Sequence, residues 1–406
     1  MLCRFLTWDV PKSLQRLRLQ PPSAPLSSPS DRSWEHRGGS GHMPGNETNS
    51  ILTSASLFSH VPTTPVVLDE TRIADRDCML SVGEVHEVLD QAWADIRTGR
   101  ASGAKSVLSL PEAAFWQEAG YEIRPSEFIG ERLGWKLSCL YGVNPRFAGV
   151  KVIGANAFNR VLGLPRSRST FILLEKFSMQ PLAIVDATRL SAGRTGAYAS
   201  QVLRLCLAKT DRINVFLFGA GPIAGAILAS LAHSAGERIA RVHVRARRLE
   251  SAKALQASLS PTLPFEIVAV EDNRFLADAD FVITATNSVS PVFADGELRR
   301  DACLLHLGGD EVPVETLRRI LRQGHLGCDD LETVSRRNSQ SLALQYSKAG
   351  TTLEALGPHL GILELSKTAD WGLDPPGSPV SVTCVGLPML DLYVVAALYE
   401  KYLAAG

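Results

Sequence analysis

The chain has 406 residues, of which 45% are hydrophobic and 21% are charged. This is the balance of a globular protein, and the length allows two domains that each bury a core. Lys plus Arg and Asp plus Glu number 42 each, so we expect no basic surface for nucleic acid. No apolar stretch reaches the ~18 residues of a membrane span, and no membrane partner is expected.

The seven cysteines include no CxxC pair, and the nine histidines include no HExxH motif. These spacings favour neither a disulfide framework nor a metal site, and we expect a reducing, cytoplasmic location. Residues 1–66 hold the run QPPSAPLSSPSDRSWEHRGGSG and show no apolar period, which is typical of a disordered tail. A transit peptide is the alternative for this stretch, although Asp9, Asp31 and Glu35 oppose it.

Two kinds of pattern follow along the chain. Apolar spacing predicts a helix over residues 79–99, and Ser81 followed by Glu84 fits a capping box at its start. Strands are expected at 147–155, 169–176 and 181–188. No long helix separates these strands, so they should pair as an antiparallel meander.

From residue 191 onward, helices alternate with strands. The strand INVFLFG is followed by the helix PIAGAILASLAHSAG, and the strands ARVHVRA, FEIVAV, DFVITAT, ACLLHLG and HLGCDD come after it. This alternation predicts a doubly wound parallel sheet, with a long amphipathic helix at 386–405 lying beyond it. The predicted fold class is α/β: a Rossmann domain over residues 191–344, inserted in an α+β domain built from residues 67–190 and 345–406.

The loop after the first of these strands matches GxGxx(G/A) through Gly219, Gly221 and Ala224. Gly219 permits the tight turn, Gly221 lets backbone approach a pyrophosphate, and Ala224 lets the helix pack close to the strand. The motif alone is a weak signal, but the strand before it and the helix after it support dinucleotide binding.

The next strand ends in Val244-Arg245-Ala246-Arg247-Arg248, where an acid would bind the ribose hydroxyls. Arg245 and Arg247 either accept the 2′-phosphate of NADP or are solvated surface residues. The cofactor is therefore NAD or NADP.

Three polar residues stand out against apolar or small neighbours. Lys151 lies within an apolar strand, where a lysine is costly unless it is paired. It either faces a substrate carboxylate or is a strand-edge lysine that points to water. Arg194 lies among small residues of a helix and either binds a carboxylate or phosphate or is an arginine on the helix surface. Asp310 follows a strand and two glycines, at the edge where ligands bind in such sheets. It is placed for proton transfer or is simply a helix cap.

Five motifs in order resemble the ornithine cyclodeaminase/mu-crystallin family: the run from GVKVIGANAFNRVLGLPRS to SAGRTGAYAS, the glycine loop, ITATNSVSPVF, LLHLGGDEVP and VTCVGLPMLDL. The resemblance covers residue 79 to the C-terminus. It implies a homodimer, a substrate-binding and dimerisation domain built from both chain ends, and a small amino or imino acid substrate.

The resemblance also assigns roles to residues. It implies that Lys151 and, more loosely, Lys105 bind the substrate carboxylate, with Arg194 near both substrate and cofactor phosphates. It makes Asp310 the catalytic acid/base, so that Asp310 and Lys151 are the expected catalytic residues. The remaining cofactor-binding residues that it implies are Ser169, Thr195 and Thr286.

The function expected from these features is an NAD(P)-dependent oxidoreductase that acts on the C–N bond of a small amino or imino acid. The alternatives are a cyclodeaminase that uses NAD catalytically and a non-catalytic ligand-binding protein. Two departures from the family pattern, Val314 in place of a lysine and Cys384 in place of a serine, bear on the substrate more than on the fold. We expect Cys384 to be a packing or pocket-wall residue.

Overall fold

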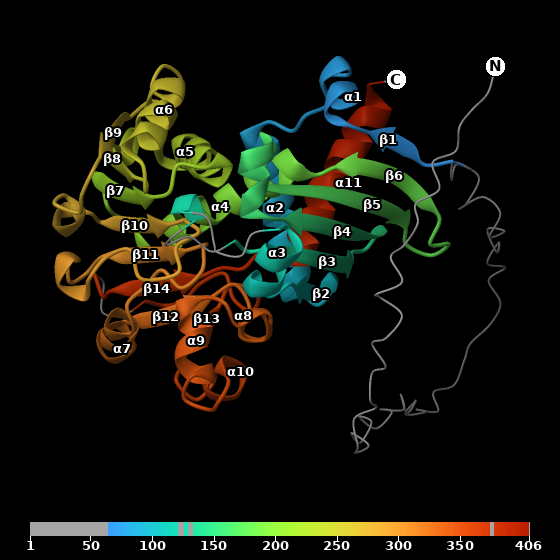
Figure 1. The fold of residues 1–406 in the computed structure, drawn as a ribbon. Coiled ribbons are helices and arrows are strands. Elements are labelled where there is room, and N and C mark those ends of the chain that lie inside the picture. Colours follow the sequence, from blue (N-terminus) through green and yellow to red (C-terminus); the bar gives the residue numbers. More distant parts are fainter. Residues whose placement is uncertain (1–63, 121–125, 129–132, 374–376, 406) are drawn as a thin grey trace, which may run out of the picture. The chain divides into compact units, whose positions relative to one another are not determined.

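The computed structural model describes residues 64–120, 126–128, 133–373 and 377–405, which belong to one compact unit (Figure 1). Most of the tail expected over residues 1–66 lies outside the described residues. Its end is misplaced, because Val66 already begins strand β1 (Val66–Leu68), which pairs in parallel with β6 (Pro181–Asp186). No helix of the described residues is long and apolar enough to cross a membrane.

A six-stranded sheet forms the first layer, in the order β1-β6-β5-β4-β3-β2. All of its pairs except β1–β6 are antiparallel. This confirms the meander expected for the last three strands, whereas the first two antiparallel strands were not predicted. The other four strands of this sheet are β2 (Ser102–Ser109), β3 (Lys136–Val143), β4 (Phe147–Ala155) and β5 (Ser167–Glu175).

An eight-stranded parallel sheet forms the second layer, in the order β13-β12-β14-β11-β10-β7-β8-β9. Its two faces are covered by separate apolar clusters, with Val215 and Leu217 of β7 in one and Phe216 and Phe218 in the other. The predicted doubly wound α/β class is therefore confirmed. The strands are β7 (Ile213–Phe218), β8 (Ile239–Arg245), β9 (Glu266–Val270), β10 (Phe281–Thr284), β11 (Cys303–His306), β12 (His325–Cys328), β13 (Leu363–Glu364) and β14 (Val380–Thr383).

The parallel sheet extends beyond the boundary expected at residue 344. Strand β14 lies between β11 and β12 and pairs with both, and β13 adds to the edge of β12. The boundary was placed too early because β14 has only four residues and no helical or alternating pattern marks it. Only the segment after Thr383 returns to the six-stranded sheet.

Eleven α-helices connect and cover the strands of the described residues (Figure 1). Helix α2 begins at the predicted capping box, in which Ser81 and Glu84 hydrogen-bond each other's backbone N–H groups. The helices are α1 (Glu70–Asp75), α2 (Val82–Arg97), α3 (Glu112–Glu118), α4 (Thr188–Cys206), α5 (Pro222–Ala235), α6 (Leu249–Leu259), α7 (Val314–Gln323), α8 (Leu331–Arg337), α9 (Ser341–Ser347), α10 (Leu353–Leu356) and α11 (Pro388–Ala404).

Helix α11 is the link between the two sheets. It follows β14 of the parallel sheet and packs on β2 to β5, α2 and α4. Twelve of its 17 residues are buried, so the expectation of an amphipathic helix is wrong. A helix apolar on all sides fits a position enclosed by other elements. The opposite face of the six-stranded sheet instead exposes large apolar side chains, among them Leu137, Tyr141 and Val152.

Candidate active site

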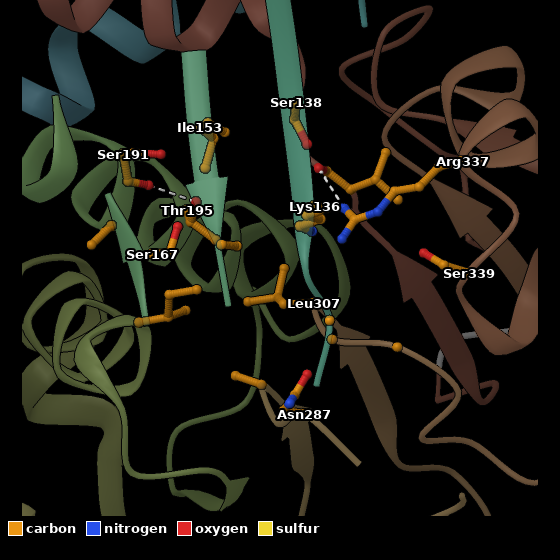
Figure 2. Close-up of a pocket in the computed structure, with 18 of the residues that line it drawn as sticks. Lys136, Ser138, Ile153, Ser167, Ser191, Thr195, Asn287, Leu307, Arg337 and Ser339 are labelled. Carbon is orange, nitrogen blue, oxygen red and sulfur yellow. Dashed lines mark hydrogen bonds between the residues drawn. The ribbon is translucent and has the colours of Figure 1, made fainter. Parts of the chain in front are cut away.

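A pocket of about 2080 Å³ opens between the two sheets (Figure 2). Its walls come from strands β2 to β5 on one side and from the carboxyl ends of β7, β8, β10 and β11 on the other. Helices α4, α5 and α8 and the start of α11 complete it. The volume exceeds that of a typical site for one drug-sized molecule, so the pocket has room for a dinucleotide together with a second small molecule.

The glycine loop lies on this pocket in the conformation that its sequence predicts. Gly219 has φ +117°, and a Cβ there would stand 2.5 Å from the carbonyl oxygen of Ala285. Gly221 is the N-cap of α5, has no side-chain cap, and a Cβ built on it meets no heavy atom within 4 Å. The first turn of α5 therefore presents its N–H groups to open space, as a phosphate-binding helix start does. Ala224 is buried beneath this turn.

Close packing of α4 against α5 explains the small residues of α4. A Cβ on Gly196 would stand 2.4 Å from the backbone of Ala226, so the two helices cross in contact at that point. This holds the start of α5 against α4, which also carries Arg194 and Thr195. Thr195 lines the pocket, and its hydroxyl donates to the carbonyl of Ser191 at 2.7 Å (Figure 2).

Arg245, the last residue of β8, and Arg247, two residues further on, line the pocket beyond the glycine loop. Arg245 is held in place, since its guanidinium donates to Asn273 Oδ1 at 2.7 Å and to the carbonyl of Val292 at 3.1 Å. Arg247 is exposed. These positions lie where a ribose would be recognised at the end of the second strand of such a sheet.

Thr286, in the loop after β10, and Ser169, on β5, both line the pocket. Thr286 is fixed by Glu311, whose carboxylate accepts from the Thr286 N–H at 2.6 Å and from its hydroxyl. Glu311 is fully buried, and burial raises its pKa. A buried acid on the loop after β11 thus anchors the loop after β10.

Lys151, expected to bind substrate, does not line the pocket. It is 0% exposed, and its Nζ lies 2.5 Å from Asp391 Oδ1 and 3.0 Å from Ser191 Oγ. Burial lowers its pKa to about 7, although Asp391 opposes this shift. The register of β4 explains the placement, because Lys151 lies beneath α11 and Ile153, two residues along the strand, reaches the pocket instead.

Arg194 shares the same carboxylate. Its Nε donates to Asp391 Oδ1 at 3.0 Å, and Asp391 is 1% exposed. The two neighbouring cations lower the pKa of Asp391 against the effect of its burial. Unlike Lys151, Arg194 lines the pocket. Asp391 Oδ1 therefore bridges a buried lysine to an arginine that faces the ligand space.

Asp329 fixes the turn against which Arg194 packs. It accepts from the N–H groups of Val385 and Gly386 at 2.8 Å each and from the Tyr198 hydroxyl at 3.0 Å. Gly386 has φ +83°, and a Cβ on it would stand 2.2 Å from the Arg194 guanidinium. The turn before α11 thus needs glycine to leave room for the arginine.

Lys105 lies on β2 and lines the pocket, as expected for a carboxylate-binding residue. Burial lowers its pKa well below the usual lysine value, and Arg337, Lys136, Arg194 and Lys151 add to the shift. Positive groups that repel one another around a pocket are stabilised by an anion. This end of the pocket is therefore suited to a carboxylate.

Asp310, expected as the catalytic acid/base, lies just outside the pocket. Leu307, Gly308 and Gly309 line the wall before it, whereas its own carboxylate lies 3.4 Å from the Nζ of exposed Lys348. Proton transfer to a bound substrate requires this side chain to leave Lys348 and turn inward. The catalytic role of Asp310 therefore stays a prediction.

Several residues of the site were not found from the sequence. Asp391 and Asp329 are the acids that organise Arg194, and Lys136, Ser138 and Arg337 line the cationic end. An acid within the apolar run PMLDLYVV was the one available signal, because such a residue needs a buried partner. Cys384 is buried outside the pocket lining with a raised pKa, which fits a packing role. No cluster of three potential metal ligands occurs among the described residues.

The model of the ornithine cyclodeaminase/mu-crystallin family matches residues 140–360, which are 221 of the 406 residues. The chain belongs to this family, and the resemblance seen in its motifs is confirmed.

Two curated relatives and one solved structure illustrate the similarity. The Delta(1)-pyrroline-2-carboxylate reductase of Colwellia psychrerythraea is 28% identical over 171 residues, which are 40% of this chain and 52% of that protein. The NAD(P)H-dependent anabolic L-arginine dehydrogenase of Pseudomonas aeruginosa is 29% identical over 56% of this chain and 70% of that protein. This chain thus spans about half the length of the first of these relatives.

Among solved structures, the Delta(1)-pyrroline-2-carboxylate reductase of Thermococcus litoralis, in complex with NADH and L-proline, superposes with a TM-score of 0.69. It is 20% identical, and the match covers 84% of this chain and 98% of that chain. At this identity the likeness shows a shared fold.

Proposed function

We propose that this protein is an NAD(P)-dependent oxidoreductase that acts on the C–N bond of a small amino or imino acid, as a dehydrogenase or an imine reductase. The observation that carries the proposal is one continuous pocket that joins an open, uncapped helix start at Gly221 to a cationic end around Lys105 and Arg194. The named relatives, which include reductases and a dehydrogenase, support this type of chemistry.

The residues around the glycine loop fit a dinucleotide. The open space over Gly221 and the N–H groups of α5 suit a pyrophosphate, and Thr195, Thr286 and Ser169 line the wall beyond it. Arg245 and Arg247 lie where the adenosine ribose would be read, as NAD or as NADP. When bound, the nicotinamide gives or accepts a hydride at the substrate carbon.

The cationic end orients the substrate. In the proposed mechanism, Lys105 and Arg194 hold the substrate carboxylate, and Asp391 fixes the direction of the Arg194 guanidinium through Nε. We assign Lys151 a positioning role rather than direct substrate binding, because its Nζ is enclosed with Asp391 and Ser191. Asp310 is proposed to move the proton of the amine or of water, after it turns away from Lys348.

A cyclodeaminase is the second candidate, since the family includes ornithine cyclodeaminases and the same residues serve both reactions. In that case NAD would act catalytically, with no net change of the cofactor, and ammonia would leave the substrate. Net change of NAD(P)H therefore separates the two functions, whereas the positions of Asp310 and Lys105 do not.

We also propose that the protein is a homodimer that pairs through the outer face of its six-stranded sheet. Leu137, Tyr141 and Val152 lie on that face and are 44%, 48% and 38% exposed. Large apolar side chains that are exposed next to one another are typical of an interaction surface. Light scattering of the full chain should give twice the monomer mass, and Tyr141→Glu should give the monomer. A monomeric wild type would contradict the proposal.

We propose a cytoplasmic location because the cysteines are not paired in disulfides within the described residues. Six of them are free in the described residues, as is usual in a reducing compartment. A fluorescent fusion of the full chain that is confined to an organelle would contradict it.

Absorbance at 340 nm tests the proposed function. Purified protein is given L-amino acids with NAD or NADP, and cyclic imines or 2-oxo-acid/amine pairs with NADH or NADPH. The proposal predicts net formation or loss of reduced cofactor that disappears in Asp310→Asn. Ammonia release from ornithine with catalytic NAD and no change at 340 nm would instead establish a cyclodeaminase. Cofactor binding without turnover on any substrate would point to a non-catalytic ligand-binding protein.

A further inference from the structure

Four side chains of the six-stranded sheet form one row along the wall of the pocket. The pairing register places Val107 of β2 opposite Ser138 of β3, Ser138 opposite Ile153 of β4, and Ile153 opposite Ser169 of β5. Residues directly opposite one another on neighbouring strands share a face of the sheet, and all four of these line the pocket. Figure 2 shows Ser138 and Ile153 on their two neighbouring strands.

Ser138 carries the polar group of this row that lacks a partner. The residue is 1% exposed, and its Oγ has no hydrogen-bond partner among the described residues. The side chains directly beside it, Val107 and Ile153, are both apolar. A buried hydroxyl that is left unpaired costs free energy, and a ligand atom that bonds to it recovers that cost. An unpaired hydroxyl on a pocket wall therefore indicates a ligand contact.

The position of Lys105 indicates which ligand atom this is. Lys105 lies two residues before Val107 on β2, so Lys105 and Ser138 are diagonal neighbours across the β2–β3 pair. Side chains in this relation have Cβ atoms ~7–8 Å apart, which a long side chain can bridge. In the proposed function Lys105 holds the α-carboxylate, and the α-nitrogen is attached to the very next carbon. The α-nitrogen is thus the polar atom closest to the bound carboxylate in any amino or imino acid.

We propose that Ser138 is a substrate-binding residue whose hydroxyl hydrogen-bonds the α-nitrogen of the amino or imino acid. This rests on the proposed function, in which Lys105 and Arg194 hold the α-carboxylate. A serine hydroxyl both donates and accepts, so it accepts from the N–H of an amine or a protonated imine and donates to the lone pair of a neutral imine. With the carboxylate held at one point and the nitrogen at another, the carbon–nitrogen bond is oriented for hydride transfer.

The ligand-free protein gives the first test. Ser138→Ala removes a buried hydroxyl that has no partner within the described part of the chain, so this variant should melt at or above the wild-type temperature. Ser109→Ala is the matched control, because Ser109 lines the same pocket from β2 but is exposed. A fall of more than about 2 °C for Ser138→Ala would mean that the hydroxyl stabilises the fold, and would overturn the proposal.

Isothermal titration of the full chain with NADH or NADPH bound tests the contact itself. The ligands are 2-hydroxybutyrate, whose hydroxyl takes the place of the α-nitrogen, and butyrate, which has no group there. Neither is turned over, because the bound cofactor is already reduced. We expect 2-hydroxybutyrate to bind about tenfold more tightly, the effect of pairing one buried hydroxyl. Ser138→Ala should bring this ratio toward one, and Ser109→Ala should preserve it.

Two results of this titration would overturn the proposal. One is a wild type that binds both ligands equally, or a ratio that persists in Ser138→Ala. The other is a preference for 4-hydroxybutyrate over 2-hydroxybutyrate that depends on Ser138, because the hydroxyl would then bind the substrate side chain.

The activity panel separates this inference from the proposed function. Turnover of an amino or imino acid with kcat and KM unchanged in Ser138→Ala would overturn the contact and leave the oxidoreductase in place. Preferential binding of 2-hydroxybutyrate that depends on Ser138, with no turnover of any amino or imino acid, would uphold the contact and overturn the oxidoreductase.

Discussion

Replacement of Lys151 by methionine tests the buried ion network directly, because this lysine is enclosed and its pKa is lowered to about 7. In the unfolded chain a lysine keeps its usual pKa of 10.5. Between these two values the unfolded chain holds a proton that the folded protein has released. The free energy of unfolding therefore rises with pH between these two values. Below both values Lys151 is protonated in both states, so it adds no pH dependence.

The size of the effect follows from one proton. The free energy of unfolding should rise by about 1.4 kcal/mol per pH unit through this site, or by about 2 kcal/mol from about pH 7.5 to about pH 9. Lys151→Met removes the titrating group but keeps the length of the side chain. The difference in unfolding free energy between wild type and variant should change by about 2 kcal/mol over that range. Taking this difference removes the contributions of the other titrating groups, because both proteins share them.

Urea denaturation of both proteins at the two pH values measures this difference. Lys209→Met, at an exposed position, is the control and should show a constant difference from the wild type. A pH-independent difference for Lys151→Met would refute the reasoning, because it would mean that Lys151 stays protonated in the folded protein.

Three further predictions follow from the site. Asp391→Asn should destabilise the protein by about 3–5 kcal/mol in urea, because Arg194 is buried and cannot lose its proton, and a loss below about 1 kcal/mol would contradict the network. Gly219→Ala should lower the melting temperature, because Gly219 has a positive φ and no room for a Cβ. Gly221→Ala should leave the melting temperature unchanged and weaken NAD(P)H binding, as measured by cofactor fluorescence. Equal effects of the two variants on melting would be inconsistent with the loop geometry. Burial lowers the pKa of His306 to about 3, so stability should fall by up to about 1.4 kcal/mol per pH unit as pH drops below 6.5, and urea midpoints that do not change between about pH 7 and about pH 5 would contradict this.

The elements predicted correctly are those whose local sequence determines them. Ser81 and Glu84 define the start of α2 by contacts within four residues, and the glycine loop needs only the strand before it and the helix after it. Strand β14 was missed because its four residues acquire their structure from β11 and β12, which are far away in the chain.

The candidate site was only partly predictable for the same reason. The sequence singles out Lys151 and Arg194 as polar residues in apolar or small surroundings, but it does not show what pairs with them. Asp391 is 197 residues away from Arg194 in the sequence. Asp329 is 56 and 57 residues away from the two N–H groups that it holds in the turn before α11. Whether a lysine faces a ligand or a buried carboxylate is decided by these long-range contacts, which no local pattern encodes.

Transfer of a labelled hydride tests the central claim most directly. The full chain is incubated with NAD(P)H that carries deuterium at the transferable position and with an imino acid, and the product is analysed by mass spectrometry. The account predicts an amino acid with one deuterium on its α-carbon, formed in equal amount to the oxidised cofactor. A product without deuterium, or ammonia release with no net oxidation of the cofactor, would contradict it.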